Sequence, residues 1–89
     1  MTEIAFSSSF KKSFKKTIKS RKKLEDRFWK KVKVFIRNPF DEQLRTHKLS
    51  GKLKKLWSFT IEYDVRVIFY FAGKGKVIFV DIGKHDEIY

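Results

Sequence analysis

The sequence of 89 residues contains no cysteine, one proline and only four glycines. Without thiols, neither a disulfide nor a thiolate-bound metal can stabilise the chain, so side-chain packing must do so. No apolar run approaches the about 20 residues that a membrane-spanning helix needs. The N-terminus, MTEIAFSSSF, has neither the basic start nor the long apolar stretch of a secretion signal. We therefore expect a soluble, cytoplasmic protein.

Acidic residues are also scarce: the sequence has ten Asp and Glu against 22 Lys and Arg, which gives a formal net charge of +12. A field of this sign and strength attracts polyanions. RNA, DNA, an anionic membrane surface and an acidic protein are all candidate partners. A basic surface that serves only solubility is the alternative.

Aromatic side chains, in contrast, are abundant: ten Phe, three Tyr and two Trp. These side chains bury the largest areas per residue, so they give a short chain the means to build a core. A chain of this length has room for one core. We expect a single domain over residues 1–89.

The first half of the sequence predicts a short strand and two helices. Residues 3–6, EIAF, read as a strand, and the serines after them can cap a helix. Phe10, Phe14 and Ile18 recur at every fourth position, which predicts a helix near residues 8–20. Five lysines occupy the rest of its surface, where they either face phosphates or are simply solvated: Lys11, Lys12, Lys15, Lys16 and Lys19.

A second helical pattern follows the break at SRKK and ends before Pro39, whose ring removes a hydrogen-bond donor. The apolar residues that share its face are Leu24, Phe28, Val32, Phe35 and Ile36. Residues 39–56 show no clear period. We interpret them as a basic loop with a short extended segment.

From Trp57 onward, the apolar period changes to two, which is typical of half-buried strands. Trp57, Phe59, Ile61 and Tyr63 should share one face. A tight turn is expected around Asp64, and AGKGK predicts a second hairpin. The order β-α-α-β-β-β predicts an α+β fold, an antiparallel sheet with a helical hairpin packed on one face.

Two charged residues interrupt the apolar strands. Arg66 lies in VRVIFYF and Asp81 in KVIFVDI. A buried arginine without a partner is costly, so Arg66 must reach a charge or a cleft. A structural ion pair with Asp64, Glu62 or Asp81 is one explanation, and a functional site is the other.

The two histidines, His47 and His85, precede and follow the three C-terminal strands and could flank one cleft. Cleavage of RNA by internal attack needs a base for the 2′-hydroxyl, an acid for the leaving 5′-oxygen and a cation at the phosphate. Imidazole can fill either proton-transfer role, and Arg66 or a lysine can supply the cation. The sequence has no metal-ligand spacing and no nucleotide-binding motif, and we expect no cofactor.

The segments HKLSGKLKKLWSFTIEYDVRVIFYF and KVIFVDIGKHDEIY resemble the RelE/ParE superfamily of bacterial toxins from type II toxin–antitoxin modules. The likeness is closest to the RelE- and YafQ-type mRNA interferases and spans nearly the whole chain. It implies a RelE-like fold similar to that of microbial ribonucleases.

Carried over by position, the resemblance implies a catalytic set of His85, His47, Asp64, Arg66 and Tyr89. The chain departs from the YafQ pattern at three positions. Thr60 replaces a histidine, Val65 a tryptophan and Asp81 an arginine. The acid–base set is therefore smaller than in that branch, and the resemblance does not assign the general base.

The resemblance implies a ribosome-dependent endoribonuclease that cuts messenger RNA without metal, is inhibited by an acidic antitoxin and docks on ribosomal RNA. The lysines expected to contact RNA are Lys11, Lys15, Lys19, Lys48, Lys52, Lys54, Lys55 and Lys84. The alternatives are a ParE-like gyrase poison without nuclease activity and an RNA-binding module without catalysis. His85 favours cleavage, because ParE-like members generally lack a catalytic histidine at the end of the last strand.

Overall fold

The computed structural model describes residues 1–49 and 55–84. Its elements, in chain order, are β1 (Glu3–Phe6), α1 (Ser8–Ile18), α2 (Lys22–Arg37), the 3₁₀ helix η1 (Glu42–Leu44), β2 (His47–Lys48), β3 (Trp57–Glu62), β4 (Val65–Gly73) and β5 (Lys76–Lys84). The expected order of strands and helices is confirmed, and β2 is the short extended segment of the loop. No helix in the described ranges is long and apolar enough to cross a membrane.

Local sequence signals set the start of α1, the turn between the helices and the end of α2. The side chain of Ser7 accepts a hydrogen bond of 3.0 Å from the backbone N–H of Phe10, so it caps α1 as the serine run predicts. Ser20 takes a left-handed conformation with φ of 59°, which turns the chain between the helices. Asn38 is extended because Pro39 follows it, and α2 ends there.

The sheet is mixed rather than purely antiparallel, which corrects one part of the expected fold. Its strand order is β1-β5-β4-β3-β2, and β2 to β5 pair antiparallel. β1 instead pairs parallel with β5, with Glu3 opposite Lys76 and Phe6 opposite Phe79. A parallel pair needs a long connection, and the two helices and the other strands provide it. The three C-terminal strands are antiparallel, as predicted.

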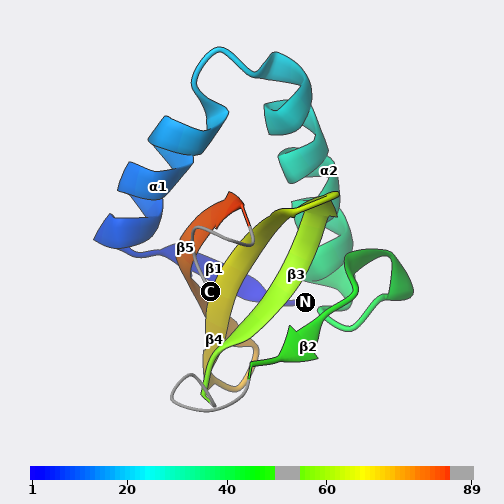
Figure 1. Cartoon of the computed structure of the whole chain (residues 1–89). Coiled ribbons are helices and arrows are strands. Elements are labelled where there is room, and N and C mark those ends of the chain that lie inside the picture. The colour runs from blue at the N-terminus through cyan, green and yellow to red at the C-terminus, as the bar shows by residue number, and fades with distance from the viewer. Residues whose placement is uncertain (50–54, 85–89) are drawn as a thin grey trace.

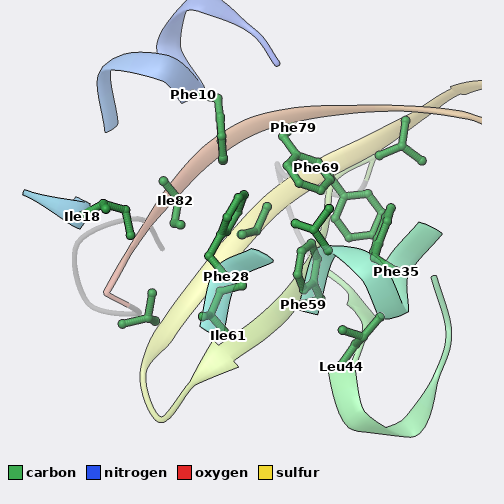
Figure 2. Packing of buried hydrophobic residues seen from close by; sticks show 14 of the residues in the cluster. Phe10, Ile18, Phe28, Phe35, Leu44, Phe59, Ile61, Phe69, Phe79 and Ile82 are labelled. Carbon is green, nitrogen blue, oxygen red and sulfur yellow. The ribbon is translucent and has the colours of Figure 1, made fainter. Parts of the chain in front are cut away.

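Both helices cover the same face of the sheet (Figure 1). The core beneath them consists largely of phenylalanine, and its fully buried rings are Phe28, Phe35, Phe59, Phe69 and Phe79. Figure 2 shows these rings between the helices and the strands. Phe35 of α2 is the central contact, because its ring lies 4.9 to 5.4 Å from the rings of Phe59, Phe69 and Phe79. Aromatic packing therefore holds α2 to three strands at once.

One residue of the predicted alternating stripe does not belong to the core. Tyr63 lies in the β3–β4 turn with φ of 41°, and 90% of its surface is exposed. The period of two ends at Ile61 because the pairing of β3 with β4 shifts register between Thr60 and Glu62. The backbone carbonyl of Tyr63 is thereby placed beside Arg66.

We predict that Phe35→Ala lowers the free energy of unfolding by about 3–5 kcal/mol, because it removes a fully buried ring and leaves a cavity. Urea denaturation followed by circular dichroism measures this loss. Phe40→Ala is the matched control, since 55% of that ring is exposed. A loss at Phe40 as large as the loss at Phe35 would contradict the described core.

Candidate functional site

The face of the sheet turned away from the helices, called here the second face, carries the candidate site. Strand alternation places Ser58 and Thr60 of β3 on it, because Phe59 and Ile61 point into the core. Their cross-strand partners are His47 of β2, opposite Ser58, and Arg66 of β4, opposite Thr60. Two of the predicted site residues therefore meet on one surface.

Arg66 is half-buried, and its hydrogen-bond partners are uncharged. Its Nη1 donates to the hydroxyl of Thr60 over 2.9 Å and to the backbone carbonyl of Tyr63 over 3.3 Å. Its Nε is buried, and among the described residues this N–H finds no acceptor. Buried guanidinium groups usually pair with an anion, and the described part of the chain supplies none to Arg66.

The structural ion pairs considered for Arg66 are not formed by the described residues. Glu62 pairs instead with Arg27 of α2, at 3.0 Å between Oε1 and Nε. Asp81 accepts a hydrogen bond of 2.9 Å from the backbone N–H of Ile82. It also lines a hollow that contains Lys16 and Arg21. The charge of Arg66 therefore has no carboxylate partner in the described structure.

His47 is oriented by contacts at both ring nitrogens. Its Nδ1 lies 3.1 Å from the carbonyl oxygen of Arg45, and its Nε2 lies 3.4 Å from the hydroxyl of Ser58. A carbonyl oxygen can only accept, so in the neutral ring Nδ1 carries the proton and Nε2 keeps its lone pair. Arg45 has left-handed φ and ψ angles that direct this carbonyl. This tautomer leaves Nε2 able to accept a proton.

His47 and Arg66 flank β3 on the second face. Ser58 and Thr60 are two residues apart, which is roughly 7 Å along a strand. β2 and β4 lie on either side of β3, so their backbones are separated by about 10 Å. The two side chains therefore lie on one face of the sheet with β3 between them.

Asp64 lies in the exposed β3–β4 turn, and Lys84 lies at the end of β5, opposite Val65. Both are at the end of the sheet that carries Arg66. Four predicted site residues lie outside the described ranges: His85, Tyr89, Lys52 and Lys54.

The remaining predicted lysines lie on two other surfaces. Lys11, Lys15 and Lys19 line a groove of about 970 Å³ between α1 and α2, whose apolar wall includes Phe14 and Trp29. Lys48 and Lys55 line a separate hollow at the β2–β3 end of the sheet. Neither surface contains Arg66.

Sequence reasoning missed the two supporting residues on β3. Ser58 faces His47 and Thr60 holds Arg66, yet neither was predicted as part of the site. The alternating pattern did place both on the polar side of the strand. In the described ranges, no group of three His, Cys, Asp or Glu residues could hold a metal ion.

A family model described as the bacterial toxin of type II toxin–antitoxin systems, YafQ, matches residues 2–89. Among solved structures, YafQ from E. coli is similar with a TM-score of 0.81 and 20% identity, over 100% of this chain and 99% of that chain. A copper-bound mutant toxin from Helicobacter pylori gives 0.77 and 25%, over 100% of both chains. A YoeB/ParE toxin from Agrobacterium tumefaciens gives 0.78 and 16%, over 96% and 99%. No curated protein sequence matches this chain.

We predict that Arg66→Met changes the free energy of unfolding by less than about 1 kcal/mol. The substitution breaks no ion pair between described residues. Loss of the two hydrogen bonds of Nη1 is offset by removal of the unpaired buried N–H at Nε. Urea denaturation of Arg66→Met, Asp81→Asn and the double variant measures the coupling between the two positions. A loss of about 3–5 kcal/mol at Arg66 that depends on Asp81 would establish a buried ion pair instead.

Proposed function

This chain belongs to the YafQ family of bacterial toxins from type II toxin–antitoxin systems, and we propose that it is an endoribonuclease that cleaves messenger RNA on the ribosome. The proposed reaction is attack of a 2′-hydroxyl on the adjacent phosphodiester, without metal. An acidic antitoxin is the proposed inhibitor.

The observation that carries the proposal is the unpaired guanidinium of Arg66. Among the described residues, its Nε has no acceptor and its charge has no carboxylate partner. A phosphate oxygen would supply both the acceptor and the charge. Thr60 and the carbonyl of Tyr63 fix Nη1, so the guanidinium is held in place before the substrate arrives. Such preorganised charge stabilises the crowded phosphorus of the transition state.

We assign proton transfer to the histidines. In this scheme Nε2 of His47 takes the proton of the 2′-hydroxyl, and the new O–P bond forms as the bond to the 5′-oxygen breaks. His85, which follows Lys84 in the sequence, protonates that leaving oxygen. The products are a 2′,3′-cyclic phosphate and a free 5′-hydroxyl. Asp64 and Tyr89 are further candidates from the family resemblance.

We propose that lysines carry most of the affinity for the ribosome, because each contact with a phosphate releases counterions. The row along α1 and its C-cap is the proposed contact with ribosomal RNA: Lys11, Lys15 and Lys19, all of which are exposed. The messenger is the proposed partner of Lys48, Lys52, Lys54, Lys55 and Lys84.

The antitoxin proposal draws on a relative. E. coli YafQ has been solved in complex with DinJ, and its structure in that complex is similar to this chain with a TM-score of 0.79 and 20% identity. An acidic antitoxin would compete for the same lysines through the net charge of +12. The groove between α1 and α2 also offers it apolar contacts at Phe14 and Trp29.

We predict that His85→Gln lowers the rate of messenger cleavage by roughly 10²–10⁴-fold, the usual effect of one acid–base group, while ribosome binding is retained. His47→Gln should cause a loss of similar scale. Single-turnover cleavage of ribosome-bound messenger measures both rates, with circular dichroism as the folding control. Arg66→Met tests the cation in the same assay, and its loss should not simply add to that of His85→Gln.

Wild-type rates for folded His85→Gln protein would exclude His85 as a catalyst. If the wild-type protein cut no messenger at all, the nuclease proposal would fail. An assay of gyrase inhibition would then test the ParE-like alternative.

We predict that the combined change of Lys11, Lys15 and Lys19 to Glu weakens ribosome binding and makes its salt dependence shallower, since fewer phosphate contacts release counterions. Cosedimentation with ribosomes over a range of salt concentrations measures both effects. The matched control changes Lys23, Lys30 and Lys33 of α2 to Glu, with the same change in net charge. Equal weakening by both triple variants would point to net charge rather than a docking face.

A further inference from the structure

Three aromatic rings from separate elements meet at the end of the sheet where β3 begins and β4 ends. Phe40 comes from the loop after α2, Trp57 opens β3, and Phe71 lies near the end of β4. The rings of Phe40 and Phe71 are nearly parallel, at 22° and 5.8 Å between centroids. The ring of Trp57 stands edge-on to both, with each centroid distance at 5.5 Å. We call this group the aromatic cluster.

The aromatic cluster extends the core but remains open to solvent. Phe71 contacts the buried Phe69, and Trp57 packs against the core. Phe40 and Phe71 are nevertheless 55% and 39% exposed. Large apolar rings that share a contiguous exposed patch commonly mark a binding surface. Packing alone therefore accounts for Trp57 but leaves the exposed faces of the other two rings unexplained.

Positive charge borders the aromatic cluster. Lys48 lies opposite Trp57 in the β2–β3 pair, and Lys55 precedes Trp57 by two residues. The described residues that line the adjoining hollow of about 480 Å³ are Lys48, Lys55, Leu56, Trp57, Tyr70 and Phe71. None of these described lining residues is acidic, so the hollow combines aromatic faces with two lysines.

This combination matches the chemistry of single-stranded nucleic acid. Every base has a flat face that stacks on an aromatic ring, and the phosphates between bases attract lysine ammonium groups. A purely apolar partner would gain nothing from the two lysines. We propose that the aromatic cluster is a stacking site for bases of single-stranded RNA, with Lys48 and Lys55 on the flanking phosphates. The inference rests on the proposed function, which supplies the RNA.

The position of the aromatic cluster separates it from the proposed chemistry. Phe71 follows Arg66 by five residues on β4, which is roughly 17 Å along the strand. A base stacked on Phe71 would therefore belong to a nucleotide away from the scissile phosphate. The aromatic cluster would help to hold the strand without taking part in bond cleavage.

Trp57 makes the proposal directly measurable, because Trp29 is the only other tryptophan. In a Trp29→Phe background, the fluorescence of Trp57 is titrated with a 2′-O-methylated oligoadenylate of about eight nucleotides, which cannot undergo 2′-hydroxyl attack. An abasic strand with the same number of phosphates is the matched ligand. We expect saturable quenching and tighter binding with the base-bearing strand.

Phe40→Leu and Phe71→Leu should each weaken binding of the oligoadenylate by at least about fivefold and leave binding of the abasic strand unchanged. Phe6→Leu is the control, since its ring is 37% exposed but belongs to another surface. Phe40 lies in a loop, so its variant keeps the test decisive if Phe71→Leu does not fold.

Equal binding of the two strands by wild-type and variant proteins would overturn the stacking site. So would a Trp57 signal that responds to an acidic peptide but not to the oligoadenylate. Messenger cleavage on ribosomes, measured in parallel, separates this failure from failure of the proposed function. If cleavage persists while stacking is absent, only the aromatic cluster loses its role.

Discussion

The contact of Phe35 with Phe59, Phe69 and Phe79 is the constraint on which the rest of the structure depends. One ring on α2 touches three strands, so the helix and the sheet cannot pack independently. Figure 2 shows how these rings fill the space between the two layers. Because a chain of 89 residues without cysteine has material for one core only, aromatic burial is concentrated on one face of the sheet.

Burial of the rings on one side of the sheet leaves the polar side chains of β3 on the second face, where Ser58 and Ile68 are themselves buried. Strand alternation sends Phe59 and Ile61 into the core and leaves Ser58 and Thr60 on the other side. These two hydroxyls hold His47 and Arg66 from the strands on either side of β3. The same strand, β3, thus contributes one face to the core and supports the candidate site with the other. The positive charge of Arg66 in this site is not neutralised by any described carboxylate.

The excess of positive charge destabilises the compact fold. Like charges repel, and a net charge of +12 on a small domain disfavours the compact state. In the described ranges only two ion pairs relieve it, Lys22 with Asp26 and Arg27 with Glu62. Most of the other described lysines are exposed. Binding of a polyanion would relieve this repulsion, which is consistent with the proposed partners.

The amino-acid sequence alone determined the secondary structure and its order. Apolar periods of four and two, the serine cap, Pro39 and the glycine hairpin are local signals, and the elements that they predict formed where these signals lie, whereas η1 was not predicted. The sequence also singled out Arg66 and Asp81 as charged interruptions of apolar strands, and His47 as one of the two histidines. Tyr89 rests on the family resemblance alone, whereas His85 was also singled out as one of the two histidines; both lie outside the described residues.

Only the tertiary structure decided how these local elements combine. The parallel pairing of β1 with β5 joins residues more than 70 positions apart, and no local period encodes it. The register shift near Thr60 removed Tyr63 from the core and gave its carbonyl to Arg66. The absence of a described acceptor at Nε of Arg66 and the meeting of Phe40, Trp57 and Phe71 likewise depend on how separate elements pack together. Sequence periodicity shows on which side of a helix or strand a residue lies. Which residues it contacts there is decided by long-range packing.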